Sequence, residues 1–184
     1  MDLNHIKSAL PDFAKDLRLN LESVLSEPGA PGLDNRQIAA IAVASSIASR
    51  HAPLVQAMEA FAASRLQAAE IAGARAAAAM MALTNVYYRF THLVGNREYE
   101  TLRAGLRMNV MASPGIDKAS FELAAMAVSA INGCAACMDS HERVLRAHGI
   151  TAQGVQSAVR IAAVLHAVAV TLEQTSPMPL ASAA

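Results

Sequence analysis

The stretch FELAAMAVSAINGCAACMDSHE, from Phe121 to Glu142, indicates the fold class of this chain. Alanine and other residues of high helix propensity dominate it, and it lacks the alternation of Val, Ile and Thr that marks strands. Gly133 divides the stretch into two expected helices, one that ends near Asn132 and one that begins at Cys134. The sequence therefore predicts an all-α structure in which two consecutive helices meet at a glycine.

The same composition extends over the whole chain of 184 residues, of which 54% are apolar and only 4% aromatic. This length suits one compact multi-helix domain, which we expect over residues 1–174, with the active-site half at about 113–174. Residues 175–184 are expected to form a disordered tail. Because the alanine-rich chain has more apolar surface than one small helical domain easily buries, we also predict a homo-oligomer.

The charge pattern argues against two classes of partner. The chain has 15 basic and 15 acidic residues, and no basic stripe that would favour nucleic acid. Residues 1–10 lack the apolar core of a signal peptide, and charge-free apolar stretches such as Ala76 to Leu83 are too short to span a bilayer. A cytoplasmic protein is therefore expected, without nucleic-acid or membrane contacts.

Helix caps and breakers divide the rest of the chain. Asp34, Asp117 and Thr151 each stand where a helix N-cap is expected. Pro11 is expected to start or kink the first helix, whose apolar side would include Phe13. The predicted helices span residues 4–26, 35–50, 53–64, 66–93, 118–132, 134–148 and 152–174, with a loop at 27–33 and a short helix and connection at 97–111.

A short internal similarity suggests a helical repeat. Ile38 to Val43 reads IAAIAV, and Leu123 to Val128 reads LAAMAV, an offset of 85 residues that places Ser49 opposite Cys134. This pattern indicates two copies of one helical unit, with reactive side chains only in the second copy. Chance similarity between two alanine-rich helices remains the alternative.

The spacing E-x11-C-x2-C-x3-H, formed by Glu122, Cys134, Cys137 and His141, predicts a dithiol redox site. A CxxC pair can close into a small disulfide ring, and its thiolates are often acidified, here by a helix N-terminus. His141 lies one helical turn after Cys137 and can accept its proton. Glu122 could orient His141, although its spacing alone is more typical of a solvated surface carboxylate.

Zinc is the other chemistry open to these residues. Cys134, Cys137 and His141 could supply three ligands and Glu122 a fourth. Structural zinc sites usually combine two such clusters, and the sequence contains no second one. We therefore expect neither a metal site nor a tightly bound cofactor.

At these residues the chain resembles the alkyl hydroperoxidase D (AhpD) family of the carboxymuconolactone decarboxylase-like superfamily. The resemblance rests on the segment from Phe121 to Glu142 and extends to EPGAPGL at 27–33 and YRFTHLV at 88–94. It implies an all-helical fold with an internal repeat, assembled as a trimer or a multiple of it. It further implies a thiol-dependent peroxidase and reductase that works with an AhpC-type peroxiredoxin and is reduced by a lipoyl-bearing protein or another lipoamide-type donor.

The resemblance also implies a role for each site residue. Cys137 would be the attacking thiolate, and Cys134 would resolve its oxidised form by closing a disulfide. Glu122 and His141 would form the proton relay. Ala136 stands where some members of the family carry a further histidine, so this chain would have one proton carrier fewer.

Three other functions stay open at this point. One is a decarboxylating lyase of the same superfamily, although that reaction would not need two cysteines. The second is a non-enzymatic dithiol redox sensor, and the third is a structural helical oligomer with unreactive cysteines. Turnover of peroxide with a recycling reductant would separate the redox enzyme from a sensor.

Overall fold

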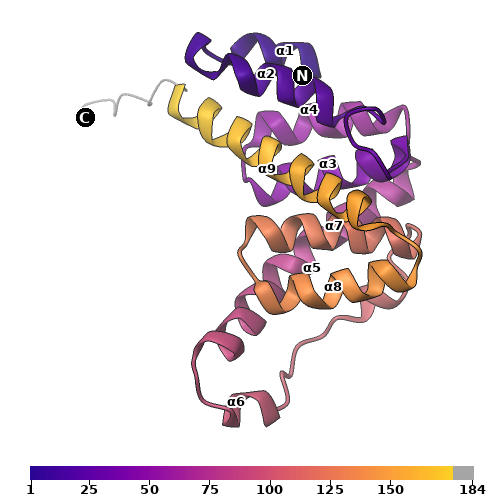
Figure 1. Cartoon of the computed structure of the whole chain (residues 1–184), viewed down its shortest axis with the longest axis vertical. Helices are drawn as coiled ribbons and strands as arrows, with labels where there is room; N and C mark the ends of the chain where they lie inside the picture. Colours follow the sequence, from indigo (N-terminus) through magenta and orange to yellow (C-terminus); the bar gives the residue numbers. More distant parts are fainter. Residues whose placement is uncertain (176–184) are drawn as a thin grey trace, which may run out of the picture.

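The structure is a computed structural model that describes residues 1–175, and every regular element in that range is a helix (Figure 1). The all-α prediction is therefore confirmed. Of the tail predicted at 175–184, Thr175 is the last residue of a helix, and the others lie outside the described residues. The helices are α1 (Leu3–Ala9), α2 (Lys15–Val24), α3 (Asn35–Ala48), α4 (Ala52–Ala63), α5 (Ala68–Leu93), α6 (Glu98–Thr101), α7 (Lys118–Ile131), α8 (Ala135–Ala147) and α9 (Ala152–Thr175), with 3-10 turns η1 (Asp12–Ala14) and η2 (Asn109–Ala112).

The predicted helix caps are present. The Asp34 carboxylate accepts hydrogen bonds from two backbone N–H groups in the first turn of α3. Asp117 accepts from the backbone N–H of Ser120 at 2.9 Å, and Thr151 Oγ1 accepts from that of Gly154 at 3.1 Å. These bonds satisfy N–H groups that have no partner within the helix, and they fix where α3, α7 and α9 begin.

The N-terminal region differs from the single helix predicted over residues 4–26. Pro11 has no N–H to donate and restricts its own backbone, so α1 ends at Ala9 and α2 begins only at Lys15. The intervening 3-10 turn changes the helical register. As a result Phe13, predicted on the apolar side, is 76% exposed.

The core forms around α3 and α7, two helices of similar sequence, which pack against each other and against α5 and α9. In both helices the middle residues are almost all buried, and many are alanine, which allows the helix axes to approach closely. The helices α1, α2 and α4 cover one end of this core. Figure 1 shows α1 and α2 at the end of the molecule opposite to α6.

The internal repeat is present, but in a different register from the predicted one. The helices α3 and α7 begin 83 residues apart, as do α4 and α8. Between the two helices of each copy, Arg50 and Gly133 occupy the same left-handed backbone conformation, with φ of 61° and 68°. The offset of 85 residues is therefore wrong by two, an error that alanine-rich sequence hides because alanine still aligns with alanine.

The corrected register shows why only the second copy contains a reactive set. Three of the four equivalent positions in the first copy, Ala39, Leu54 and Met58, are apolar, and their side chains are fully buried in the core. The equivalent pairs are Ala39 and Glu122, His51 and Cys134, Leu54 and Cys137, and Met58 and His141.

Helix α9 differs from the prediction that the apolar stretches of this chain are too short to span a bilayer. Within residues 1–175 it is the one helix long and apolar enough to cross a membrane, with a mean hydropathy of 1.6. Half of this window is buried inside the protein, where α9 packs on α2, α3 and α7. The apolar character of α9 is thus explained by its place in the core.

Candidate dithiol site

Cys134 and Cys137 form a disulfide in this structure, with their Cα atoms 5.3 Å apart. Cys134 is the N-cap residue of α8, and Cys137 lies in the first turn of that helix. Gly133, at φ of 68°, makes the sharp turn from α7 into α8, a conformation that residues with a Cβ rarely adopt. Both sulfurs therefore lie at a helix N-terminus, where the backbone dipoles favour a thiolate after reduction.

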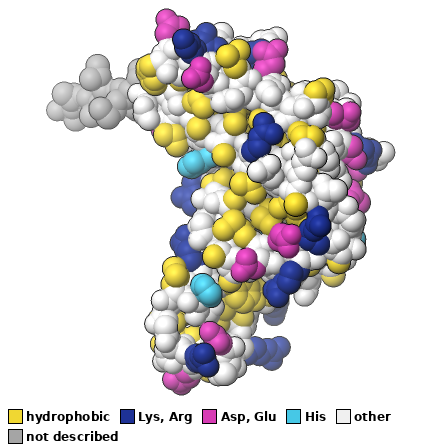
Figure 2. Space-filling model, viewed as in Figure 1, with side chains coloured by type: hydrophobic (Ala, Val, Ile, Leu, Met, Phe, Trp, Pro, Cys, Tyr) yellow, Lys and Arg dark blue, Asp and Glu magenta, His cyan; other side chains and the backbone are white. Residues whose placement is uncertain are grey.

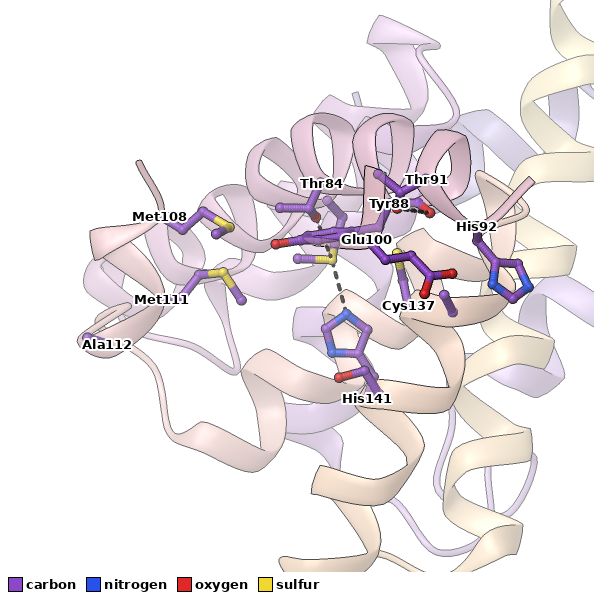
Figure 3. A pocket seen from close by; sticks show the side chains of 13 residues that line it. Thr84, Tyr88, Thr91, His92, Glu100, Met108, Met111, Ala112, Cys137 and His141 are labelled. Carbon is purple, nitrogen blue, oxygen red and sulfur yellow. Dashed lines mark hydrogen bonds between the residues drawn. The ribbon is translucent and has the colours of Figure 1, made fainter. Parts of the chain in front are cut away.

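The two cysteines differ in access. Cys134 is fully buried, whereas Cys137 is 7% exposed and lines a pocket of about 780 Å³ (Figure 3). Because Cys137 faces the pocket and Cys134 does not, a molecule in the pocket would meet Cys137 first. The remaining lining residues are Met81, Thr84, Tyr88, Thr91, His92, Glu100, Met108, Met111, Ala112, Ala136, Ser140 and His141.

His141 and Glu122 are in contact inside the protein. His141 Nδ1 lies 2.6 Å from Glu122 Oε2, and the two residues are 7% and 3% exposed. The contact joins α8 to α7. The interpretation of Glu122 as a solvated surface carboxylate is therefore wrong, because α7 turns this side of the helix toward α8.

Glu122 has a second charged partner, Lys118, one turn earlier on α7. Lys118 Nζ lies 2.7 Å from Glu122 Oε1. Burial raises the pKa of the Glu122 carboxyl, but the hydrogen bonds and positive charges of His141 and Lys118 oppose this and leave the pKa below its ordinary value of 4.5. Glu122 is thus an ionised carboxylate at neutral pH.

The ionised carboxylate determines the proton position on the imidazole. A carboxylate can only accept, so His141 Nδ1–H donates to Glu122 and leaves Nε2 to exchange protons on the pocket side. Nε2 also lies 3.1 Å from Met81 Sδ on α5, a sulfur that can only accept, so Nε2 donates to it when the imidazole is protonated at both nitrogens. Sequence reasoning missed both Lys118 and Met81. The i,i+4 spacing of Lys118 and Glu122 was a usable signal, whereas nothing local to Met81 marks it.

A buried polar cluster supports the segment that leads into the cysteines. Asn85 Nδ2 donates to Ser129 Oγ at 3.0 Å, and Asn132 Nδ2 donates to Asn85 Oδ1 at 2.9 Å. The backbone carbonyl of Ser129 accepts from the N–H of Cys134 at 3.1 Å. Asn85 on α5 thereby ties the end of α7 to the start of the dithiol turn.

The pocket has one mainly thioether wall and one polar wall. Met108 and Met111 come from the segment after α6 and lie on one side of Cys137 in Figure 3, while His92, near the end of α5, lies on the other. The pocket is thus formed between α5, α8 and the segment that follows α6. Within residues 1–175, no three His, Cys, Asp or Glu side chains are grouped in a way that could hold a metal ion.

The chain is thus an all-helical protein that combines a CxxC disulfide with a buried histidine–carboxylate pair. Comparison with known proteins agrees with this class. The model of the carboxymuconolactone decarboxylase family matches residues 97–175. Alkyl hydroperoxide reductase AhpD of Bradyrhizobium sp. (strain BTAi1 / ATCC BAA-1182) is 49% identical over 99% of both chains. The protein of the same name from Streptomyces griseus is 50% identical over 94% of this chain and 96% of its own.

This similarity over nearly the full length of both chains places the protein in a family. The chain belongs to the alkyl hydroperoxide reductase AhpD family.

Proposed function

We propose that the chain is a thiol-dependent alkyl hydroperoxide reductase whose redox centre is the Cys134–Cys137 pair. One observation supports this most strongly. Cys137, one half of the disulfide, lines the pocket one helical turn before His141, and the buried Glu122 carboxylate orients that histidine. The names of the relatives agree with this activity.

In the oxidative half of the proposed cycle, His141 Nε2 takes the proton of the Cys137 thiol. The thiolate attacks the terminal peroxide oxygen, the O–O bond breaks, and the alkoxide leaves as an alcohol after receiving a proton from His141. Cys137 becomes a sulfenic acid. The thiol of Cys134 then attacks the Cys137 sulfur, which forms the disulfide and releases water.

In the reductive half, an external dithiol reduces the disulfide. One thiolate of the donor attacks Cys137, the more accessible sulfur, and Cys134 leaves as a thiolate. The second donor thiol then releases Cys137 and closes the donor's own disulfide. We propose a lipoamide-type donor on a lipoyl-bearing protein, and an AhpC-type peroxiredoxin as a partner whose disulfide the same dithiol could reduce.

We also propose a homo-oligomer, a trimer or a multiple of it, in the cytoplasm. Figure 2 shows hydrophobic side chains between charged ones over the middle of one face. Among residues 1–175, most of the large exposed hydrophobic side chains lie on α5 and the segment after it. They are Leu83, Val86, Phe90, Leu93, Val94, Tyr99, Leu102 and Val110. An apolar surface of this extent supports contacts between subunits.

The test is consumption of an alkyl hydroperoxide by the purified protein with dihydrolipoamide as reductant. We expect turnover by the wild-type protein and its loss in both Cys137→Ser and Cys134→Ser. A protein that forms the disulfide but fails to turn over with any dithiol would instead be a redox sensor. Absence of any reaction between the reduced protein and the hydroperoxide would overturn the proposal.

A further inference from the structure

The charged residues of the site extend beyond the pocket. His141 lines the pocket, whereas Glu122 and Lys118 do not. Glu122 contacts the Nδ1 side of the His141 ring. Along the series from His141 through Glu122 to Lys118, the first two are almost fully buried, and the side chain of Lys118 is 44% exposed. Lys118 is therefore the member of this series that is in contact with solvent.

We propose that Lys118 is a positioning residue, which holds the Glu122 carboxylate ionised and aimed at His141 and thereby makes Cys137 easier to deprotonate. The proposal deepens the proposed function, since it concerns the reactivity of the same thiol. It assigns a role to a residue outside the E-x11-C-x2-C-x3-H pattern.

The first reason is the charge balance around Glu122. A carboxylate at 3% exposure loses most of its hydration and needs positive partners to stay ionised. Among the described residues, the charged groups that act on Glu122 are His141 from α8 and Lys118 from its own helix, with none from α3, α5 or α9. His141 is neutral for part of its cycle, so Lys118 is the permanent positive charge.

The second reason is the position of the imidazole proton. If Glu122 became protonated, its O–H could donate to Nδ1, and the ring proton would then reside on Nε2. An Nε2–H cannot accept the proton of Cys137. By keeping Glu122 ionised, Lys118 preserves the arrangement in which Nδ1 holds the ring proton and Nε2, which also contacts Met81 Sδ, takes up a proton as the base.

A neutral side chain of similar length can separate the effect of the Lys118 charge from the effect of its size. Lys118 is the first residue of α7, and its ammonium group also lies 5.8 Å from the centre of the Phe121 ring. Methionine has a stem of similar length without the charge. Replacement by methionine therefore removes the charge that pairs with Glu122 and keeps an unbranched side chain at this position.

The experiment measures the rate of Cys137 alkylation by iodoacetamide as a function of pH, in reduced protein of the Cys134→Ser background. Loss of a nearby positive charge raises the pKa of an acid, so Lys118→Met should move the midpoint to higher pH by about one unit, with about tenfold slower alkylation below it. Lys118→Gln, a second neutral variant, should shift it similarly. Lys118→Arg should restore the wild-type midpoint. Lys15→Met, at an exposed lysine of α2, should leave it unchanged.

Wild-type midpoints in both Lys118→Met and Lys118→Gln would overturn the proposal, as would a Lys118→Arg variant that shifts as far as Lys118→Met. The assay requires neither a peroxide nor a reductant. Failure of the proposed function would appear as absent hydroperoxide turnover in the wild-type protein, and it would leave these alkylation profiles interpretable.

Discussion

Glu122 and His141 are 19 residues apart in sequence, and a contact of 2.6 Å joins their side chains across the interface of α7 and α8. The turn at Gly133 makes this contact possible, because it folds α8 back along α7. The same turn places the two cysteines at the N-terminus of α8. One local feature of the backbone thus brings the thiol, the base and the carboxylate together.

The lowered pKa of Glu122 predicts a contribution to stability that depends on pH. Because the folded-state pKa lies below the unfolded value near 4.5, this contribution is present above that value and is lost as pH falls through the folded pKa. We expect the free energy of unfolding to decline as pH falls below about 4.5, and to decline less steeply in Glu122→Gln. Urea unfolding at about pH 5 and about pH 3 brackets this window and measures both slopes.

The control for this prediction is Glu142→Gln on α8. Glu142 is half exposed, and its carboxylate lies 3.8 Å from Arg146 Nε on the same helix. This substitution should leave the wild-type slope almost unchanged. Equal slopes in wild type and Glu122→Gln would contradict the role of the buried carboxylate in stability.

Asn85 should matter for stability although it lies outside the sequence pattern. Asn85→Leu keeps the branched shape and the number of side-chain heavy atoms but removes the partners of Ser129 Oγ and Asn132 Nδ2. Leaving buried polar groups unpaired should lower the free energy of unfolding by about 1–3 kcal/mol. Denaturant unfolding checks this, with the exposed Asn109→Leu as the control. A loss no greater than that of the control would show that Ser129 and Asn132 find other partners.

The two equivalent left-handed positions of the repeat should respond in opposite directions. Gly133→Ala introduces a Cβ that meets no atom within 4 Å, so its effect is confined to the backbone and should destabilise the protein by about 1 kcal/mol. Arg50→Gly relieves the same restriction, with φ of 61°, and should leave stability equal or slightly higher. Thermal unfolding of both variants measures the pair, and destabilisation of similar size in both would refute the equivalence.

A histidine added at Ala136 should strengthen direct peroxidase activity. Ala136 lines the pocket in the first turn of α8, beside Cys137, so Ala136→His would supply a second proton carrier there. We expect kcat with an alkyl hydroperoxide to rise by about tenfold. Ala135→His, whose site is exposed and outside the pocket lining, is the matched control. An equal change in the two variants would assign the effect to added charge at the helix terminus.

The helices and their caps could be predicted from sequence because the signals are local. Asp34 and Asp117 cap the helices that their positions predicted, and Gly133 makes the predicted break. The burial of Glu122 could not be predicted in this way, since it depends on how α7 is rotated against α8. The contact between Met81 and His141, 60 residues apart, likewise needs the packing of α5 against α8.

In the proposed cycle, Cys137 attacks the peroxide and Cys134 resolves the product. Mass spectrometry of the reduced single-cysteine variants, treated with one equivalent of alkyl hydroperoxide in the presence of dimedone, tests it most directly. We expect a sulfenic-acid adduct on Cys137 in Cys134→Ser and little adduct in Cys137→Ser, where the fully buried Cys134 remains. The reverse pattern, or no adduct in either variant, would contradict it.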